Sequence, residues 1–129
     1  MTTRATARLL SATRVGADDF LCAFDAGKAF PDALPGQFVH VRAPADVTLR
    51  RPFSVAAVGG PGRFELLIRR RGRGTDAIVS LPAGAEVSVL GPAGNGFGLP
   101  DAGETAVLVA GGIGAAGLRH LSRTLRRDG

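Results

Sequence analysis

Short stretches of alternating apolar and polar residues follow one another along the first hundred residues. A period of two sends successive side chains to opposite faces, which is typical of a half-buried β-strand. In residues 37–42, for example, Val39 and Val41 point one way and their neighbours the other. On this pattern we predict six strands, at residues 6–11, 20–26, 37–42, 53–58, 64–70 and 86–90.

Turn residues separate these stretches. Pro35-Gly36, Gly59-Gly60-Pro61-Gly62 and Pro82-Ala83-Gly84 are strong turn signals. Residues 75–81 are predicted to form a short helix, with Thr75 or Asp76 near its N-terminus as the cap. Six short strands with this turn spacing predict a mainly β fold, a six-stranded antiparallel Greek-key barrel.

The pattern changes after residue 100. Residues 105–110 form a continuous apolar run, which predicts a strand buried on both faces of a parallel sheet. A glycine-rich turn at residues 111–114 leads into a predicted helix. Its apolar stripe is formed by Leu118, Leu121 and Leu125, with Arg119, Arg123, Arg126 and Arg127 on other faces or at its end.

This strand and helix are typical of the first βα unit of an α/β nucleotide-binding domain. We therefore divide the chain into a barrel domain, residues 1–100, and the incomplete start of a second domain, residues 101–129. A buried parallel strand needs neighbours on both edges. We expect the sequence to be the front part of a longer protein.

Cysteine content and hydropathy limit the function classes. The only cysteine, Cys22, permits no internal disulfide and no cysteine-ligated cluster or zinc site within the chain, so we predict a buried small hydrophobe. No segment approaches the roughly twenty apolar residues of a membrane span, and residues 1–8 lack a signal core. A cytoplasmic protein without a membrane partner is expected.

The formal net charge of +5 raises the possibility of nucleic-acid binding. Aromatic residues for base stacking are scarce and the arginines are dispersed, which argues against it. One dense cluster stands out, at Arg69, Arg70, Arg71 and Arg73. For Arg71 and Arg73, a phosphate-facing role and a solvated strand end remain equally open.

Three motifs in order carry the candidate chemistry. In residues 51–54, an arginine beside a proline can bind an anion, and a serine hydroxyl can reach the polar edge of a ring. Arg73-Gly74-Thr75 adds backbone N–H groups for phosphate oxygens. The third is Gly91-Pro92-Ala93-Gly94-Asn95-Gly96-Phe97. Together they predict a site for a phosphorylated, flat, redox-active ligand, a flavin nucleotide. Asn95 and Phe97 either lie near the flavin or only shape the turn.

At these motifs the chain resembles the ferredoxin reductase-like flavoproteins. Within them it is most similar to the electron-transfer subunits of NAD-dependent dihydroorotate dehydrogenases, over almost its whole length. The matching stretches are residues 35–40, 50–54, 72–75, 90–97 and 107–118. The run from Gly91 to Phe97, with residues 37–40 upstream, points to the dihydroorotate branch.

The resemblance implies a role for each matching residue in FAD binding. Arg51 would contact the phosphates or ribityl chain, Pro52 and Phe53 would line the ring, and Ser54 would hydrogen-bond its reactive edge. Further along the chain, Ile68, Arg69 and Arg70 would pass along the cofactor, and Gly74 and Thr75 would hold the diphosphate.

The resemblance also implies a second nucleotide and a partner. Gly111, Gly112 and Gly114 would admit the NAD(H) pyrophosphate. The family carries a [2Fe-2S] cluster on a cysteine-rich segment, whose ligands this sequence lacks, and passes electrons to an FMN-containing catalytic subunit. Two residues depart from the family pattern: Ala110 stands for a glycine and Gly117 for a common proline.

Hydride transfer between a nicotinamide and a flavin requires no side-chain nucleophile, so we predict no catalytic residue and no metal ligand. His40 is interpreted as a packed or rim histidine, isolated from His120. Three alternatives remain: a reductase serving a ferredoxin or an oxygenase, a non-catalytic barrel that docks on a partner, and a basic barrel that binds nucleic acid. Because the flavin of this family lies between two domains, we expect the isolated chain to retain FAD weakly or not at all.

Overall fold

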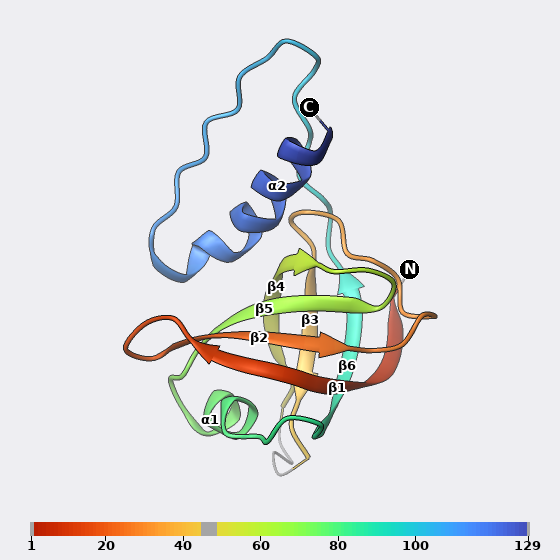
Figure 1. Cartoon of the computed structure of the whole chain (residues 1–129), viewed down its shortest axis with the longest axis vertical. Coiled ribbons are helices and arrows are strands. Elements are labelled where there is room, and N and C mark those ends of the chain that lie inside the picture. Colours follow the sequence, from red (N-terminus) through yellow and green to blue (C-terminus); the bar gives the residue numbers. More distant parts are fainter. Residues whose placement is uncertain (1, 45–48, 129) are drawn as a thin grey trace.

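The computed structural model of the chain describes residues 2–44 and 49–128. Six strands precede a C-terminal helix, and a short helix lies between the fifth and sixth strands (Figure 1). The elements are β1 (Thr3–Arg14), β2 (Asp19–Asp25), β3 (Phe38–Arg42), β4 (Arg51–Val58), β5 (Arg63–Arg69), α1 (Arg73–Val79), β6 (Glu86–Ala93), the 3-10 helix η1 (Gly112–Gly114) and α2 (Ala115–Asp128).

The strands close into an antiparallel barrel in the order β1-β2-β5-β4-β3-β6. Register shifts interrupt the ladders between Leu9 and Ser11 in β1, between Phe38 and His40 in β3 and between Val55 and Ala57 in β4. Irregularities of this kind bend and twist a strand, which closing a small barrel requires. The predicted six-stranded antiparallel barrel is confirmed.

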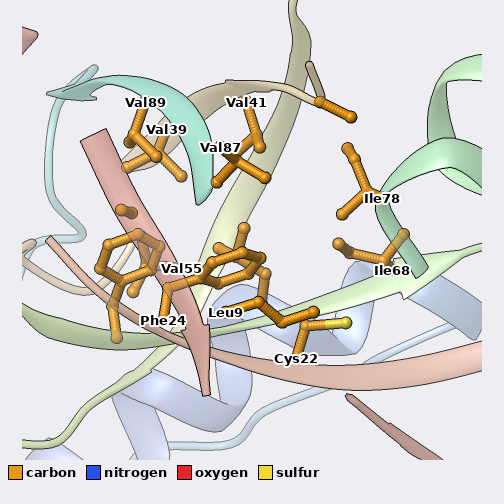
Figure 2. Close-up of a cluster of buried hydrophobic side chains, with 14 of the residues drawn as sticks. Leu9, Cys22, Phe24, Val39, Val41, Val55, Ile68, Ile78, Val87 and Val89 are labelled. Atoms are coloured by element: carbon orange, nitrogen blue, oxygen red, sulfur yellow. The ribbon is translucent and has the colours of Figure 1, made fainter. Parts of the chain in front are cut away.

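The barrel interior is filled with aliphatic and phenylalanine side chains (Figure 2). Val39 and Val41 are fully buried, as their alternation with polar neighbours predicts. Phe24 stacks on Phe64 with 5.5 Å between ring centroids. Cys22 is a free, fully buried thiol, and burial raises its pKa to about 11. Its predicted role as a small hydrophobe is confirmed.

Helices α1 and α2 lie at opposite ends of the barrel (Figure 1). Helix α1 closes one end of the barrel, where Ile78 packs with Ile68 in the core (Figure 2). The helix begins at Arg73 and not at Thr75, so the predicted start was two residues late. Helix α2 packs against β4, which runs from the α1 end of the barrel toward α2 (Figure 1).

The predicted strand at residues 105–110 was wrong. All six residues are described, none forms a strand, and Val107 and Val109 are 80% and 84% exposed. A strand gains its hydrogen bonds only from neighbours, and in this chain the segment arcs away from the barrel (Figure 1). The apolar composition therefore indicates a strand that the chain alone does not form.

The packed face of α2 also differs from the prediction. Its buried residues are Ala116, Gly117, His120 and Leu121, so only one leucine of the predicted stripe is buried. Arg119 turns toward the barrel, donating to the Ala56 carbonyl at 3.2 Å and to the Glu65 carboxylate at 2.7 Å. Small residues let the helix approach β4 closely, which the leucine spacing could not indicate.

Within the described residues, no helix is both long and apolar enough to cross a bilayer.

Burial of His120 predicts a loss of stability in mild acid. Burial, and then the charges of Arg127 and Arg123, lower its pKa below the ordinary 6.5, while Asp32 acts in the opposite direction. A lowered pKa means that the unfolded chain binds the proton more tightly, so stability is full above about pH 6.5 and declines as pH falls below it. Urea unfolding at several pH values should show this slope, reduced in His120→Gln. His40→Gln is the control. If the slope of stability against pH is as steep in His120→Gln as in the control, another group is responsible.

Candidate functional site

The first residue of β4, the loop before α1 and the first turn of α1 form one cavity. Strands β4 and β5 are antiparallel, so Arg51 at the start of β4 lies beside the chain that leaves β5. The cavity has a volume of about 290 Å³, and its walls are Arg51, Arg71, Gly72, Arg73, Gly74 and Thr75. Residues some twenty positions apart in two sequence motifs thus meet around one space.

The chemistry of this cavity suits a polyanion. Three arginines line it, Arg51, Arg71 and Arg73, and none of the described residues that line it is acidic. Gly72 adds backbone with open space where a Cβ would lie. Guanidinium groups form strong charge-assisted hydrogen bonds with phosphate oxygens. The donor set therefore fits the diphosphate of a dinucleotide.

Thr75 shapes the loop around this cavity. Its hydroxyl oxygen accepts hydrogen bonds from the backbone N–H groups of Arg71 at 2.8 Å and Gly72 at 3.2 Å. The same hydroxyl lies 3.2 Å from the Gly72 carbonyl oxygen, to which it donates. The side chain thus holds the glycine turn in a compact form, with successive N–H groups oriented together.

The other β4 residues of the motif divide between the two faces of the strand. Pro52 and Ser54 are exposed, whereas Phe53 is half-buried and packs against the core. Because Phe53 keeps part of its surface exposed, its place along a ring stays a prediction. Ser54 is three residues beyond Arg51, about 10 Å along a strand and on its opposite face. None of the described cavities contains both.

The arginines that end β5 are already paired. Arg69 donates to both carboxylate oxygens of Asp19, at 2.8 and 3.3 Å, and this hydrogen bonding lowers the pKa of Asp19. Arg70 pairs with Asp18 at 3.3 Å and lies over the ring of Phe20. The Ile68 side chain is fully buried, so only its backbone can face a ligand. That Ile68, Arg69 and Arg70 pass along a cofactor by backbone and side chain stays a prediction.

The glycine turn before α2 reaches the same end of β5. Gly111, Gly112 and Gly114 are exposed, and Gly112 has a φ of 66°. A Cβ at Gly112 would lie 4.0 Å from Nη1 of Arg69, the guanidinium nitrogen that Asp19 leaves free. The two glycine-rich turns predicted for two nucleotides therefore flank the end of one strand.

Phe97 is a candidate site residue whose place the sequence left open. Its N–H donates to the Pro35 carbonyl at 2.7 Å, and its ring lies 3.7 Å from where a Cβ of Gly117 would be. That Cβ would also be 4.0 Å from Cβ of Ser54. The ring is 44% exposed beside the serine predicted to meet the flavin edge. No local pattern signals this contact, because it joins a turn, a strand and a helix.

Two glycines around Phe97 should respond to alanine in opposite directions. Gly36 has a φ of 98° and its added Cβ would lie 2.9 Å from the Phe97 nitrogen, so Gly36→Ala should destabilise by roughly 1–3 kcal/mol. Gly117→Ala places its Cβ at ordinary contact distances inside a helix and should stabilise by up to about 1 kcal/mol. Urea unfolding measures both. Equal effects of the same sign would contradict this packing.

Comparison with known proteins agrees with this architecture. Residues 6–97 match the family model described as oxidoreductase FAD-binding domain. An Enterococcus faecalis dihydroorotate dehydrogenase B (NAD(+)) electron transfer subunit is 42% identical over 99 residues, covering 74% of this chain and 38% of the relative. The Desulforamulus reducens protein of the same name is 41% identical over 122 residues, covering 92% and 47%. The chain thus spans less than half the length of these curated relatives.

Solved structures show the same fold. The ferredoxin reductase of a carbazole 1,9a-dioxygenase superposes with a TM-score of 0.87 at 24% identity, covering 99% of this chain and 40% of the other. An Amycolatopsis cytochrome P450 reductase gives 0.78 at 30% identity, covering 95% and 39%. Because the family model spans more than half of the sequence, the chain belongs to the oxidoreductase FAD-binding domain family.

Proposed function

We propose that this chain is the FAD-binding part of an electron-transfer subunit that passes electrons between NAD(H) and a dihydroorotate dehydrogenase catalytic subunit. The observation that carries the proposal is the acid-free cavity that Arg51 shares with residues 71–75. The names and identities of the curated relatives supply the dihydroorotate branch. The division into a FAD barrel, residues 1–100, and the start of an NAD domain, residues 101–129, belongs to the same proposal.

The residues of the cavity would hold the charged part of FAD. Arg51 would neutralise the diphosphate, with Arg71 and Arg73 on the same wall. The backbone of Gly74 would donate an N–H group, and Thr75, which accepts from the N–H groups of Arg71 and Gly72, would keep that loop in shape. A charged, preorganised donor set needs little rearrangement to bind an anion.

The other end of the cofactor would lie toward α2. Ser54 and Phe97 are exposed there beside Gly117, so a hydroxyl and an aromatic ring are available to a flat ligand. When bound, FAD supplies the redox chemistry, which exchanges a hydride with a nicotinamide and electrons with an acceptor. The protein's task is to orient the ring and exclude water, which explains why no side-chain nucleophile is needed.

The second nucleotide would approach from the neighbouring turn. Gly111, Gly112 and Gly114 would border the NAD(H) pyrophosphate, at the end of β5 where Arg69 keeps Nη1 free. The whole protein would add a [2Fe-2S] cluster, whose cysteine ligands this sequence lacks, and an FMN-containing catalytic partner. Both follow from the family resemblance.

A reductase serving an oxygenase is the second candidate. It is favoured by the 30% identity to the Amycolatopsis cytochrome P450 reductase over nearly the whole chain. Both candidates require FAD in the same barrel and differ in the protein that receives the electrons. Association with the partner therefore distinguishes them.

Titration of the chain with FAD tests the shared step. We expect saturable but weak binding, seen as quenched flavin fluorescence, and loss of the yellow colour during gel filtration. Co-expression with a dihydroorotate dehydrogenase catalytic subunit should yield a complex that a P450 partner does not form. The opposite partner preference would favour the oxygenase-type reductase, and no saturable FAD binding would contradict both.

A further inference from the structure

A second cavity lies between α2 and the end of β4. It has a volume of about 260 Å³, and its walls are Ala57, Val58, His120, Arg123, Thr124 and Arg127. It shares no lining residue with the cavity around Arg51. The proposed flavin site therefore leaves it unused.

The charged groups of this cavity are cationic. Arg123 and Arg127 line it, and no acidic residue is among the described residues of its wall. The nearby carboxylate of Glu65 is engaged by Arg119 at 2.7 Å, leaving Arg123 at 4.0 Å. Arg127 pairs with the exposed Asp128 next to it, through Nε at 3.1 Å. Much of the positive charge on the α2 side of this cavity is thus available to a ligand.

His120 adds a polar group that the protein leaves without a partner. The residue is 3% exposed, and its Nδ1 is buried with no hydrogen bond in the described part of the chain. In the tautomer that carries its proton on Nδ1, this nitrogen is a buried donor without an acceptor, which a bound oxyanion would supply. The imidazole therefore offers a donor, as do the Thr124 hydroxyl and the two guanidinium groups.

We propose that this cavity binds a phosphate-type oxyanion, either free phosphate or the phosphate of a nucleotide. Two guanidinium groups, a hydroxyl and an imidazole from one helix face form its walls against β4. A bound anion would link the arginines of α2 at the place where this helix packs on β4. Because η1 leads directly into α2, the same anion would steady the glycine turn that the nicotinamide nucleotide is proposed to use.

Calorimetric titration of the chain with inorganic phosphate, at constant ionic strength, tests this site. Arg123→Ala combined with Arg127→Ala should weaken phosphate binding by roughly tenfold or more, since two charge-assisted contacts are lost. Arg126→Ala is the matched control, because Arg126 is an exposed arginine of the same helix outside the cavity. It should bind phosphate as the unmodified chain does.

A second control separates this site from the flavin cavity. Arg51→Ala should retain phosphate affinity, whereas loss in that variant would assign the anion to the other cavity and overturn the proposal. No phosphate binding by the unmodified chain, or equal losses in all arginine variants, would also overturn it. Adenosine monophosphate binding more tightly than phosphate would identify a nucleotide ligand, and equal affinity would identify phosphate alone. These outcomes are independent of whether the chain binds FAD.

Discussion

Gly62→Ala should destabilise the barrel by roughly 2–5 kcal/mol, combining left-handed backbone strain with an overpacked turn. Gly62 has a φ of 74°, and an added Cβ would lie 1.9 Å from the Gly27 carbonyl oxygen. The neighbouring backbone is fixed, because the N–H of Ala26 donates to the Gly62 carbonyl at 2.8 Å. The free energy of unfolding in urea measures the loss.

Gly60→Ala is the matched control for this effect. Gly60 lies in the same turn with a φ of 120°, but a Cβ there would meet no atom within 4 Å. Both substitutions therefore strain the backbone, and only Gly62→Ala adds a collision. If the two variants unfold with the same free energy, the close approach of the two loops is absent in solution.

The second large effect is expected on FAD binding. Replacing Arg51 and Ser54 together with alanine removes a guanidinium from the diphosphate end and a hydroxyl from the ring end of the proposed site. Losing one charge-assisted and one neutral hydrogen bond should weaken binding by roughly 30-fold or more. Fluorescence titration with FAD measures the change in dissociation constant.

Arg63→Ala is a suitable control for the charge lost in that variant. Arg63 is an exposed arginine of β5 that pairs with Asp25 at 3.4 Å and does not line the cavity. Its removal lowers the net charge without altering the proposed site, so FAD affinity should change little. A double variant that binds FAD as tightly as the unmodified chain would remove the case for this site.

The barrel could be predicted because its signals are local. Alternation around Val39 and Val41, with glycine and proline turns between strands, specifies each strand from its own few residues. The prediction of a strand at residues 105–110 was wrong for the opposite reason, because its signal is not local. Its apolar composition describes a burial that depends on neighbours outside the segment.

The candidate site could be predicted only in part. Arg51 and the loop at residues 71–75 share a cavity, as their motifs suggested. The pairing of Arg69 with Asp19, fifty positions away, depends on the register of β2 with β5, which no local pattern reveals. The contact of Phe97 with Gly117 likewise depends on how α2 docks on the barrel.

Amide chemical shifts during a titration with FAD test the central claim most directly. The account places the diphosphate at the loop before α1 and the ring beside Ser54. Resonances of Gly72, Gly74, Thr75 and Ser54 should therefore move together, while those of Thr6 and Ser88, which line a separate cavity, stay in place. Shifts confined to Thr6 and Ser88, with the loop and Ser54 unmoved, would contradict it.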